Sequence, residues 1–362
     1  MFQISVLPPE SMLPQLFPVE NQVDDDLADE HDQAAGMKPA PTLQLKDNDM
    51  ILSLKLATKG FVVLAAGALA LTGCTNASEA APAGSGNDSS SAPATFDPTT
   101  VAKDDSLASQ VPEAIKSRGT LRVASDTSYP PAEFLGGADN QTPMGYDMDI
   151  AKALSATLGL KTEIQPASFT AIIPALGPKF DLGISSFTIT KERLQTVNFV
   201  SYFQSGIAWA SQKGNPNNFS PDNVCGKKVG AASGTGFVTF VQDKSDACVA
   251  AGKEPVEIVQ LEKQTDFQIR VTSGAVDAVV ADSPVIGLLV QQSNNTMEQA
   301  GDIEGSWLQG IPISKEDTAL ANVIQQAMNK LIADGTYKKI LDSWNVADGA
   351  VPTSEVNPSV SE

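Results

Sequence analysis

The sequence predicts an α/β fold with two similar lobes, each a mostly parallel sheet flanked by helices. Short apolar segments suited to β-strands alternate along the chain with segments whose apolar residues recur at helical spacing. Such alternation is typical of parallel sheets covered by helices. A weak internal repeat predicts the second lobe, because residues 125–129 follow the first expected strand as residues 233–237 follow a similar one.

The expected elements begin at about residue 117. Strands are expected at 121–124, 162–165, 180–184, 228–231 and 276–281. Helical spacing of apolar residues predicts a helix through Ile150, Leu154 and Leu158, a second through 169–176, and a late one through Leu320, Ile324, Met328 and Leu331.

Polar residues follow equivalent strands in the two halves of the chain. The segment 180–182 leads to Ser185 and Ser186, as 276–278 leads to Ala281 and Asp282. Open α/β sheets bind ligands at the carboxyl ends of their strands. The pattern therefore predicts a cleft between the two lobes, although chance similarity is the alternative for so short a repeat.

The composition excludes several classes of function. The 362 residues carry 43 acidic and 24 basic side chains, a net charge of −19 that would repel nucleic acid. The single histidine, His31, precedes an expected export signal, so histidine-based triads and histidine-ligated zinc are excluded from the mature domain. We expect no catalytic residues, no metal and no cofactor.

Three cysteines divide into two roles. Cys74 ends an apolar stretch, whereas Cys225 and Cys248 lie within the expected folded region. A disulfide between the latter two fits an extracellular protein, and two buried free thiols are the alternative.

Residues 50–73 have the features of a lipoprotein signal peptide. Lys55 and Lys59 supply positive charge, and 61–71 is an apolar run too short to span a bilayer comfortably. The sequence Leu71-Thr72-Gly73-Cys74 resembles a bacterial lipobox, in which the cysteine receives a diacylglyceryl group before cleavage. A core helix that ends in a chance cysteine is the alternative. Export predicts a protein anchored by lipid to the outer face of the cell membrane.

The segments on either side of this signal are expected to lack a fold. Residues 1–49 are acidic where a signal peptide would begin with positive charge, so they are interpreted as a non-native or misannotated extension before a start at Met50. Residues 74–116 are expected to form a flexible linker, because the part after Cys74 is rich in small and polar residues.

Several residues suit a free amino acid as ligand. Arg193 can bind a carboxylate through two hydrogen bonds, and 233–236 can present backbone amides at a helix start. Asp282 can hold the ammonium, and Tyr129 and Phe169 can pack on the aliphatic part. Each has a structural alternative, since Arg193 can pair with a surface carboxylate, Asp282 can cap a helix and Phe169 can belong to the core.

The order of these segments resembles the polar amino-acid family of bacterial ABC-transporter solute-binding proteins over about 117–346. The matching stretches are 121–131, 145–149, 169–176, 180–193, 226–235, 276–284 and 331–344. The most specific is the run Ser186-Phe187-Thr188-Ile189-Thr190-Lys191-Glu192-Arg193. Gly236 departs from the threonine that is frequent in relatives.

The resemblance implies a type II periplasmic-binding-protein fold with a double-crossover hinge near 205–208 and 305–312. It implies that lobe 1 comprises 117–206 and 307–346, that lobe 2 comprises 207–306, and that 347–362 is a disordered tail.

The resemblance also assigns roles in the cleft. Arg193 would bind the α-carboxylate with Thr188 and the amides of Thr235 and Gly236. Asp282 and the Ser186 carbonyl would hold the ammonium. The remaining expected contacts are side-chain packing by Tyr129 and Phe169, and distal contacts by Asp126, Ser185 and Asp147.

By this resemblance, the chain is expected to be a monomeric, non-enzymatic binding component of an ABC transporter. It would capture a free polar amino acid outside the membrane and deliver it to a permease. Two alternatives stay open: a periplasmic enzyme of the same fold, similar to cyclohexadienyl dehydratase, and a sensor-type binding module.

Overall fold

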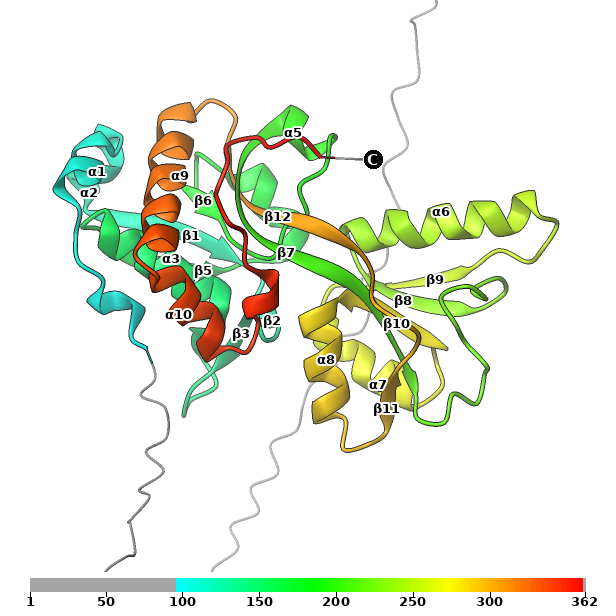
Figure 1. Ribbon diagram of the computed structural model, residues 1–362. Coiled ribbons are helices and arrows are strands. Elements are labelled where there is room, and N and C mark those ends of the chain that lie inside the picture. The colour runs from blue at the N-terminus through cyan, green and yellow to red at the C-terminus, as the bar shows by residue number, and fades with distance from the viewer. Residues whose placement is uncertain (1–95, 361–362) are drawn as a thin grey trace, which may run out of the picture. The chain divides into compact units, whose positions relative to one another are not determined.

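Two long antiparallel strands, β7 (Val197–Gln212) and β12 (Glu304–Ser314), run through the middle of one mixed sheet in the computed structural model (Figure 1). The structure describes residues 96–360, which lie within the compact unit Gly86–Glu362. The strand order is β5-β1-β6-β12-β7-β10-β8-β9, and β11 pairs with β7. The other strands are β1 (Thr120–Ser125), β5 (Lys161–Pro166), β6 (Leu182–Gly183), β8 (Lys228–Ala232), β9 (Glu257–Leu261), β10 (Ala278–Asp282) and β11 (Met297–Gln299).

One half of the sheet contains the first strands of the chain. β1 pairs in parallel with both β5 and β6, and its Leu121 and Val123 are fully buried. In Figure 1 this half lies beside α3 (Tyr146–Thr157), α9 (Thr318–Ala333) and α10 (Thr336–Ser343). Strand, crossover helix and parallel strand follow one another here, as the alternating sequence pattern predicted.

The other half of the sheet is built in the same way. β8 pairs in parallel with β9 and β10, and α6 (Gly236–Ala250), α7 (Phe267–Thr272) and α8 (Ser283–Gln292) contact these strands. The five residues of β10 are all buried, because the sheet continues on both sides and alternate side chains pack into two apolar clusters, Ala278 and Val280 in one and Val279 and Ala281 in the other.

β7 changes its neighbours where it passes from one half to the other. Up to Ile207 it pairs with β12, and from Ile207 onward it pairs with β10, with β11 pairing to its residues 210–212. The ladder between β7 and β12 shifts register between Glu304 and Trp307 and again between Gln309 and Gly310. Both expected crossover segments, 205–208 and 305–312, therefore fall on these two strands.

A small second sheet and several short helices complete the described part. The sheet contains β2 (Ser128–Tyr129), β3 (Glu133–Gly136) and β4 (Thr142–Met144) in antiparallel order. The short helices are η1 (Pro98–Thr100), α1 (Asp105–Gln110), α2 (Glu113–Arg118), α4 (Phe169–Ile172), η2 (Ile173–Ala175), α5 (Arg193–Thr196), η3 (Gln264–Asp266) and η4 (Ala347–Gly349).

Two of the segments expected to lack structure are folded in part. Within the expected linker 74–116, η1, α1 and the start of α2 are formed, and Leu107, Val111 and Ile115 pack into the main core. These three residues recur every four positions, a helical spacing that the composition of the segment obscured. The folded region therefore begins before residue 117.

The expected disordered tail 347–362 is also wrong over 347–360. Val356 forms a β-bridge with Val200, and Ala350 forms one with Phe203, so this segment lies along β7. Ser354 Oγ donates a hydrogen bond to the Ser201 carbonyl over 2.6 Å. The tail was expected where the family resemblance ends, but its hydrogen bonds to a strand edge hold it in place.

Several expectations lie outside the described residues. These are the extension 1–49, the signal peptide 50–73 and the lipidated Cys74. Among residues 96–360, none of the helices combines the length and the apolar character that crossing a membrane requires.

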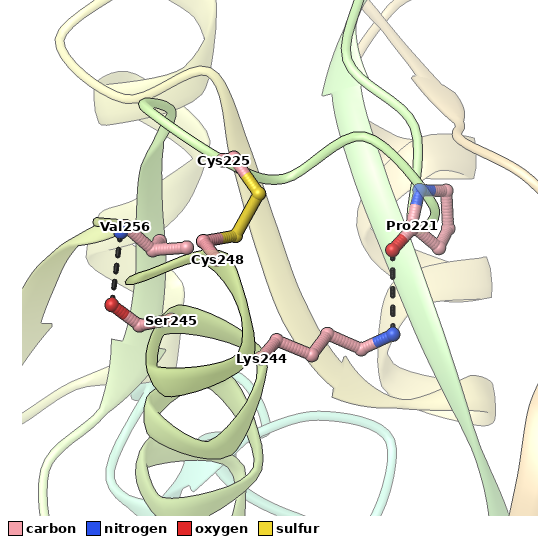
Figure 2. The surroundings of a disulfide bond; sticks show 6 residues. All are labelled: Pro221, Cys225, Lys244, Ser245, Cys248 and Val256. Carbon is pink, nitrogen blue, oxygen red and sulfur yellow. Dashed lines mark hydrogen bonds between the residues drawn. A yellow bond between two sulfur atoms is a disulfide. The ribbon is translucent and has the colours of Figure 1, made fainter. Parts of the chain in front are cut away.

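A disulfide joins Cys225 to Cys248, as the sequence predicted (Figure 2). Cys225 lies in the loop before β8, and Cys248 lies near the end of α6. Nearby, Ser245 Oγ accepts a hydrogen bond from the Val256 amide at 3.0 Å, and Lys244 donates one to the Pro221 carbonyl at 3.3 Å. These links attach the C-terminal half of α6 to the loops on both sides of it.

Candidate functional site

A cleft of about 420 Å³ is lined by residues from both halves of the sheet. Its polar lining residues follow strand ends: Asp126 after β1, Ser185 after β6, Thr235 after β8 and Asp282 at the end of β10. The cleft therefore lies where an open α/β sheet is expected to bind a ligand.

The structure brings ten of the eleven predicted binding residues to this cleft. They are Asp126, Tyr129, Phe169, Ser185, Ser186, Thr188, Arg193, Thr235, Gly236 and Asp282. The exception is Asp147, which lies behind the wall of the cleft.

Arg193 provides the positive charge of the cleft. Its Nη1 donates to the Thr188 carbonyl at 2.7 Å, and its Nη2 donates to the Gly234 carbonyl at 2.9 Å. The guanidinium carbon lies 5.4 Å from the ring centres of both Phe169 and Phe187. Burial lowers the pKa of Arg193 to about 10, so the side chain stays charged at neutral pH. A guanidinium held over aromatic rings is well suited to bind a carboxylate.

The N-terminus of α6 reaches the cleft beside Arg193. Thr235 is the N-cap of this 15-residue helix, and the first-turn backbone N–H groups of a helix have no partner within the helix. A Cβ atom added to Gly236 would lie 3.4 Å from the Trp307 ring and 3.8 Å from Thr188 Oγ1. Glycine thus keeps this helix start open on its cleft side. The start of α6 and the guanidinium of Arg193 together are suited to bind an anion.

Asp282 provides a buried negative charge. It ends β10, is only 2% exposed, and accepts a hydrogen bond from the Tyr129 hydroxyl at 2.7 Å through Oδ2. Burial raises the pKa of Asp282 to about 6, although the bond from Tyr129 partly offsets this effect. A carboxylate in such a place favours a cation beside it.

Asp126 is held by the backbone around it. Its Oδ1 accepts a hydrogen bond from Ser128 Oγ at 2.6 Å, and its Oδ2 accepts one from the Phe169 amide at 3.0 Å. Its own amide donates to Ser185 Oγ at 3.0 Å. These bonds fix the direction of the carboxylate at the edge of the cleft.

Glu133 lines the cleft and was missed by the sequence analysis. It is 1% exposed, and its two oxygens accept hydrogen bonds from Ser185 Oγ at 2.9 Å and Ser186 Oγ at 3.2 Å. Burial and the neighbouring carboxyl of Asp147 raise the pKa of Glu133 well above its usual range. No periodic or motif signal marks this position, because its burial depends on how β3 packs against the end of β6.

The prediction that Asp147 meets a ligand requires correction. Its Oδ2 accepts hydrogen bonds from the Ser186 amide at 3.0 Å and the Tyr202 hydroxyl at 2.8 Å. Ser186 has a φ of +49°, a backbone conformation that is uncommon for residues other than glycine. Asp147 therefore acts on the cleft through Ser186, whose left-handed backbone it holds.

Other lining residues were also missed. They are Ser128, Ala232, Phe237, Glu262 and Gln264. Phe237 lies one residue beyond the predicted anion-binding segment 233–236, so its place in the cleft could have been predicted from that segment. Gln264 lies in a short η3 helix without any periodic pattern, and the sequence carries no sign of its burial.

No group of three or more histidine, cysteine or acidic residues suited to a metal ion occurs among residues 96–360. Two charged groups of the cleft, Arg193 and Asp282, suit a molecule that carries both a carboxylate and a cationic group.

Comparisons with known proteins agree with this geometry. The model for "Bacterial extracellular solute-binding proteins, family 3" matches residues 121–347. The arginine-binding protein ArgT of Corynebacterium glutamicum is 30% identical over 253 residues, which cover 69% of this chain and 82% of that protein. The L-cystine-binding protein TcyJ of Escherichia coli is 27% identical, over 65% of this chain and 85% of that protein.

Solved structures give the same result. An ancestral arginine-binding protein bound to arginine is 35% identical with a TM-score of 0.57, over 63% of this chain and 98% of the other. An ancestral amino-acid-binding protein that is a precursor of cyclohexadienyl dehydratase is 31% identical with a TM-score of 0.55, over 64% and 98%. The predicted two-lobed α/β fold class is thereby confirmed.

Proposed function

The chain belongs to the bacterial extracellular solute-binding proteins of family 3, and we propose that it binds a free amino acid with a cationic side chain for delivery to the permease of an ABC transporter. The observation that carries the ligand class is that Arg193 and Asp282 line one cleft. An amino acid carries the opposite charges on its α-carboxylate and α-ammonium, so one molecule satisfies both residues.

The carboxylate would bind to Arg193 and to the start of α6. Two independent features favour an anion there: the guanidinium, which can donate two parallel hydrogen bonds, and the Gly236 amide at the start of α6. The Thr235 amide, also expected to contribute, donates to the Ala232 carbonyl at 3.3 Å. Thr188 lines the same part of the cleft. The ammonium would bind to Asp282, whose buried carboxyl also lies beside Tyr129, Ser205 and Gln309.

The charges of the cleft favour a cationic side chain. Once Arg193 and Asp282 are matched by the ligand, the acidic residues Asp126 and Glu262 still line the cleft, and Arg193 is its sole lysine or arginine among the described residues. A guanidinium or ammonium at the end of the side chain reduces this excess of negative charge. Several relatives are named as arginine-binding proteins, which supports the same choice.

We propose that binding couples to closure about β7 and β12. In this proposal lobe 1 comprises 117–206 and 307–346 and carries Arg193, while lobe 2 comprises 207–306 and carries Asp282. A ligand that contacts both lobes favours the closed arrangement because only closure lets both of its ends bind. Hinge closure of periplasmic binding proteins is a general mode of such transitions.

The ligand is identified by a thermal-shift panel of the proteinogenic amino acids with ornithine, citrulline and cystine, followed by titration calorimetry. A bound ligand raises the melting temperature according to RT ln(1 + [L]/Kd). We expect the largest shifts with arginine, lysine or ornithine. A protein that is stabilised by none of these compounds would contradict the ligand class.

We propose that the ligand is released unchanged. The matched relatives are named as binding proteins, although one structural neighbour is a precursor of an enzyme. The enzymatic alternative predicts turnover of prephenate or arogenate by the purified protein. Turnover that is lost in an Asp282→Asn variant would replace the transport role with catalysis.

We also propose that Cys74 carries a lipid anchor, that the protein acts as a monomer, and that it works on the outer face of the cell membrane. The family is extracellular, and the lysines and lipobox-like sequence of 50–74 support the anchor. Expression of Cys74→Ser in a bacterial host with lipoprotein processing tests this. Retention of that variant on the membrane in the same amount as the unaltered protein would contradict the anchor.

A further inference from the structure

Gln264 has a buried side-chain amide without hydrogen bonds. The residue is 3% exposed, and neither Oε1 nor Nε2 has a hydrogen-bond partner among the described residues. Buried polar groups in folded proteins are almost always paired, because burial without a partner forfeits their bonds to water. The amide therefore points to a partner that the protein itself does not supply.

The position of Gln264 shows where this partner would lie. Gln264 lines the same cleft as Arg193 and Asp282, and it begins the η3 helix between β9 and α7. The η3 segment contacts β2, which carries Tyr129 and comes from the other half of the chain. The amide thus lies where segments that are far apart in the sequence meet around the cleft.

We propose that Gln264 is a specificity-determining residue that accepts a hydrogen bond from the distal end of the ligand's side chain. This inference rests on the proposed function, since it concerns the same cleft. Arg193 and Asp282 account for the two charges that every amino acid carries, and neither distinguishes one side chain from another. Gln264 adds a neutral group whose hydrogen bonds depend on what the side chain presents.

The surroundings of Gln264 indicate the kind of group that it contacts. Its amide oxygen is an acceptor, and the carboxylates of Glu133 and Glu262 line the same cleft. A side chain that ends in several N–H donors, such as a guanidinium, can bond to the amide oxygen and to a carboxylate at once. An apolar side chain leaves the amide without a partner and is disfavoured.

The test compares two ligands in two proteins by titration calorimetry. L-Norvaline has the same three side-chain carbons as L-arginine without the guanidinium, so it isolates the distal contact. Gln264→Met has nearly the same shape but cannot accept the hydrogen bond. We expect Gln264→Met to weaken arginine binding about 10-fold or more. Norvaline binding should change by less than about threefold, since norvaline makes no bond to lose.

Gln292→Met is the matched control, because Gln292 is exposed on α8 and does not line the cleft. It should bind both ligands as the unaltered protein does. An arginine affinity of Gln264→Met within about twofold of the unaltered value would overturn the inference, as would equal losses for the two ligands.

Two further outcomes distinguish failure of this inference from failure of the proposed function. If Gln264→Met fails to fold by circular dichroism, Gln264→Glu replaces it. That variant retains acceptor oxygens, so its ratio of arginine to norvaline affinity should stay equal or rise, and a fall would overturn the inference. If the unaltered protein binds no amino acid, or binds norvaline as tightly as arginine, the proposed function fails. If the unaltered protein prefers arginine but Gln264→Met keeps the same preference, only the role of Gln264 fails.

Discussion

The hydroxyl of Tyr129 donates a hydrogen bond to Asp282 Oδ2 at 2.7 Å and accepts one from the Asp282 amide at 3.1 Å. These two residues are 153 positions apart, on β2 and at the end of β10. The pair fixes Oδ2 of the buried carboxylate and ties it to the backbone at the end of β10. Asp282 is therefore held in one orientation where it lines the cleft.

Ligand affinity is expected to depend on pH through Asp282. Burial raises the pKa of Asp282 to about 6, and only the ionised carboxylate attracts an ammonium. Affinity should therefore be constant well above this pKa and fall by up to about tenfold for each pH unit below it. Titration calorimetry between about pH 5 and about pH 8 measures how affinity depends on pH. This range extends from about one pH unit below the pKa of Asp282 to about two units above it.

The control for this profile is Asp282→Asn. The amide cannot ionise, so the variant should bind weakly and lose most of the dependence on pH. An unchanged profile in Asp282→Asn would assign the titration to another group.

Replacement of Arg193 should show whether ligand binding needs only its positive charge or also the planar arrangement of its donors. Arg193→Lys keeps the positive charge but loses the planar pair of donors and the hydrogen bond to the Gly234 carbonyl. We expect the amino-acid affinity to fall about 100-fold, or about 2.7 kcal/mol, with little change in melting temperature. Arg270→Lys is the control, because Arg270 is exposed on α7. Equal affinities in the two variants would remove Arg193 from the site.

Glu133 is expected to lower stability at high pH. Its folded pKa is raised by burial and by Asp147, so its contribution to stability is full below the unfolded pKa and is lost as pH rises through the folded one. Glu133→Gln has the same shape and never ionises. Relative to the unaltered protein, it should gain stability as pH rises, by at most about 1.4 kcal/mol per pH unit.

Calorimetric melting between weakly acidic and alkaline pH tests this expectation. Glu163→Gln makes the same change of charge at an exposed position of β5 and should show no such gain. If Glu133→Gln is the less stable protein at alkaline pH, then the carboxylate contributes bonds that outweigh its burial.

Loss of the disulfide should lower stability more than it lowers affinity. Cys225 and Cys248 are 23 positions apart, and closing a loop of this length restricts the unfolded chain by about 3 kcal/mol. The double variant Cys225→Ala/Cys248→Ala should lose about this amount in urea denaturation. The helix start at Gly236 lies at the opposite end of α6, so ligand affinity should change less than about threefold. A loss of affinity larger than the loss of stability would show that the bond also positions the cleft.

The sequence predicted strands near β1, β5, β6, β8 and β10, helices near α3, α4 and α9, and most of the cleft, for identifiable reasons, but it did not predict the long central strands β7 and β12. Leu121 and Val123 alternate toward a buried face, and Ile150, Leu154 and Leu158 recur at helical spacing, so local patterns determine these elements. Arg193 and Asp282 were ambiguous alone, because each also suited a surface ion pair or a cap. Only the order of family motifs placed both beside one cleft.

Other features depend on tertiary packing, which leaves no local mark. Asp147 was expected at the ligand because it follows Gly145 and Tyr146 in a family motif, but the rotation of α3 turns its carboxylate toward Tyr202. Glu133 and Gln264 are polar residues at the starts of the short elements β3 and η3, and such residue types are usually exposed. Their burial arises only when segments from distant parts of the chain come together.

The C-terminal segment has a consequence for the purified protein. Around Val200 and Phe203, β7 pairs with β12 along one edge and with residues 350–356 along the other. The span matched by the family ends at residue 347 and contains all the residues that line the cleft. A protein trimmed to that span would keep the complete binding site, yet it would expose an unpaired strand edge on which further copies could assemble.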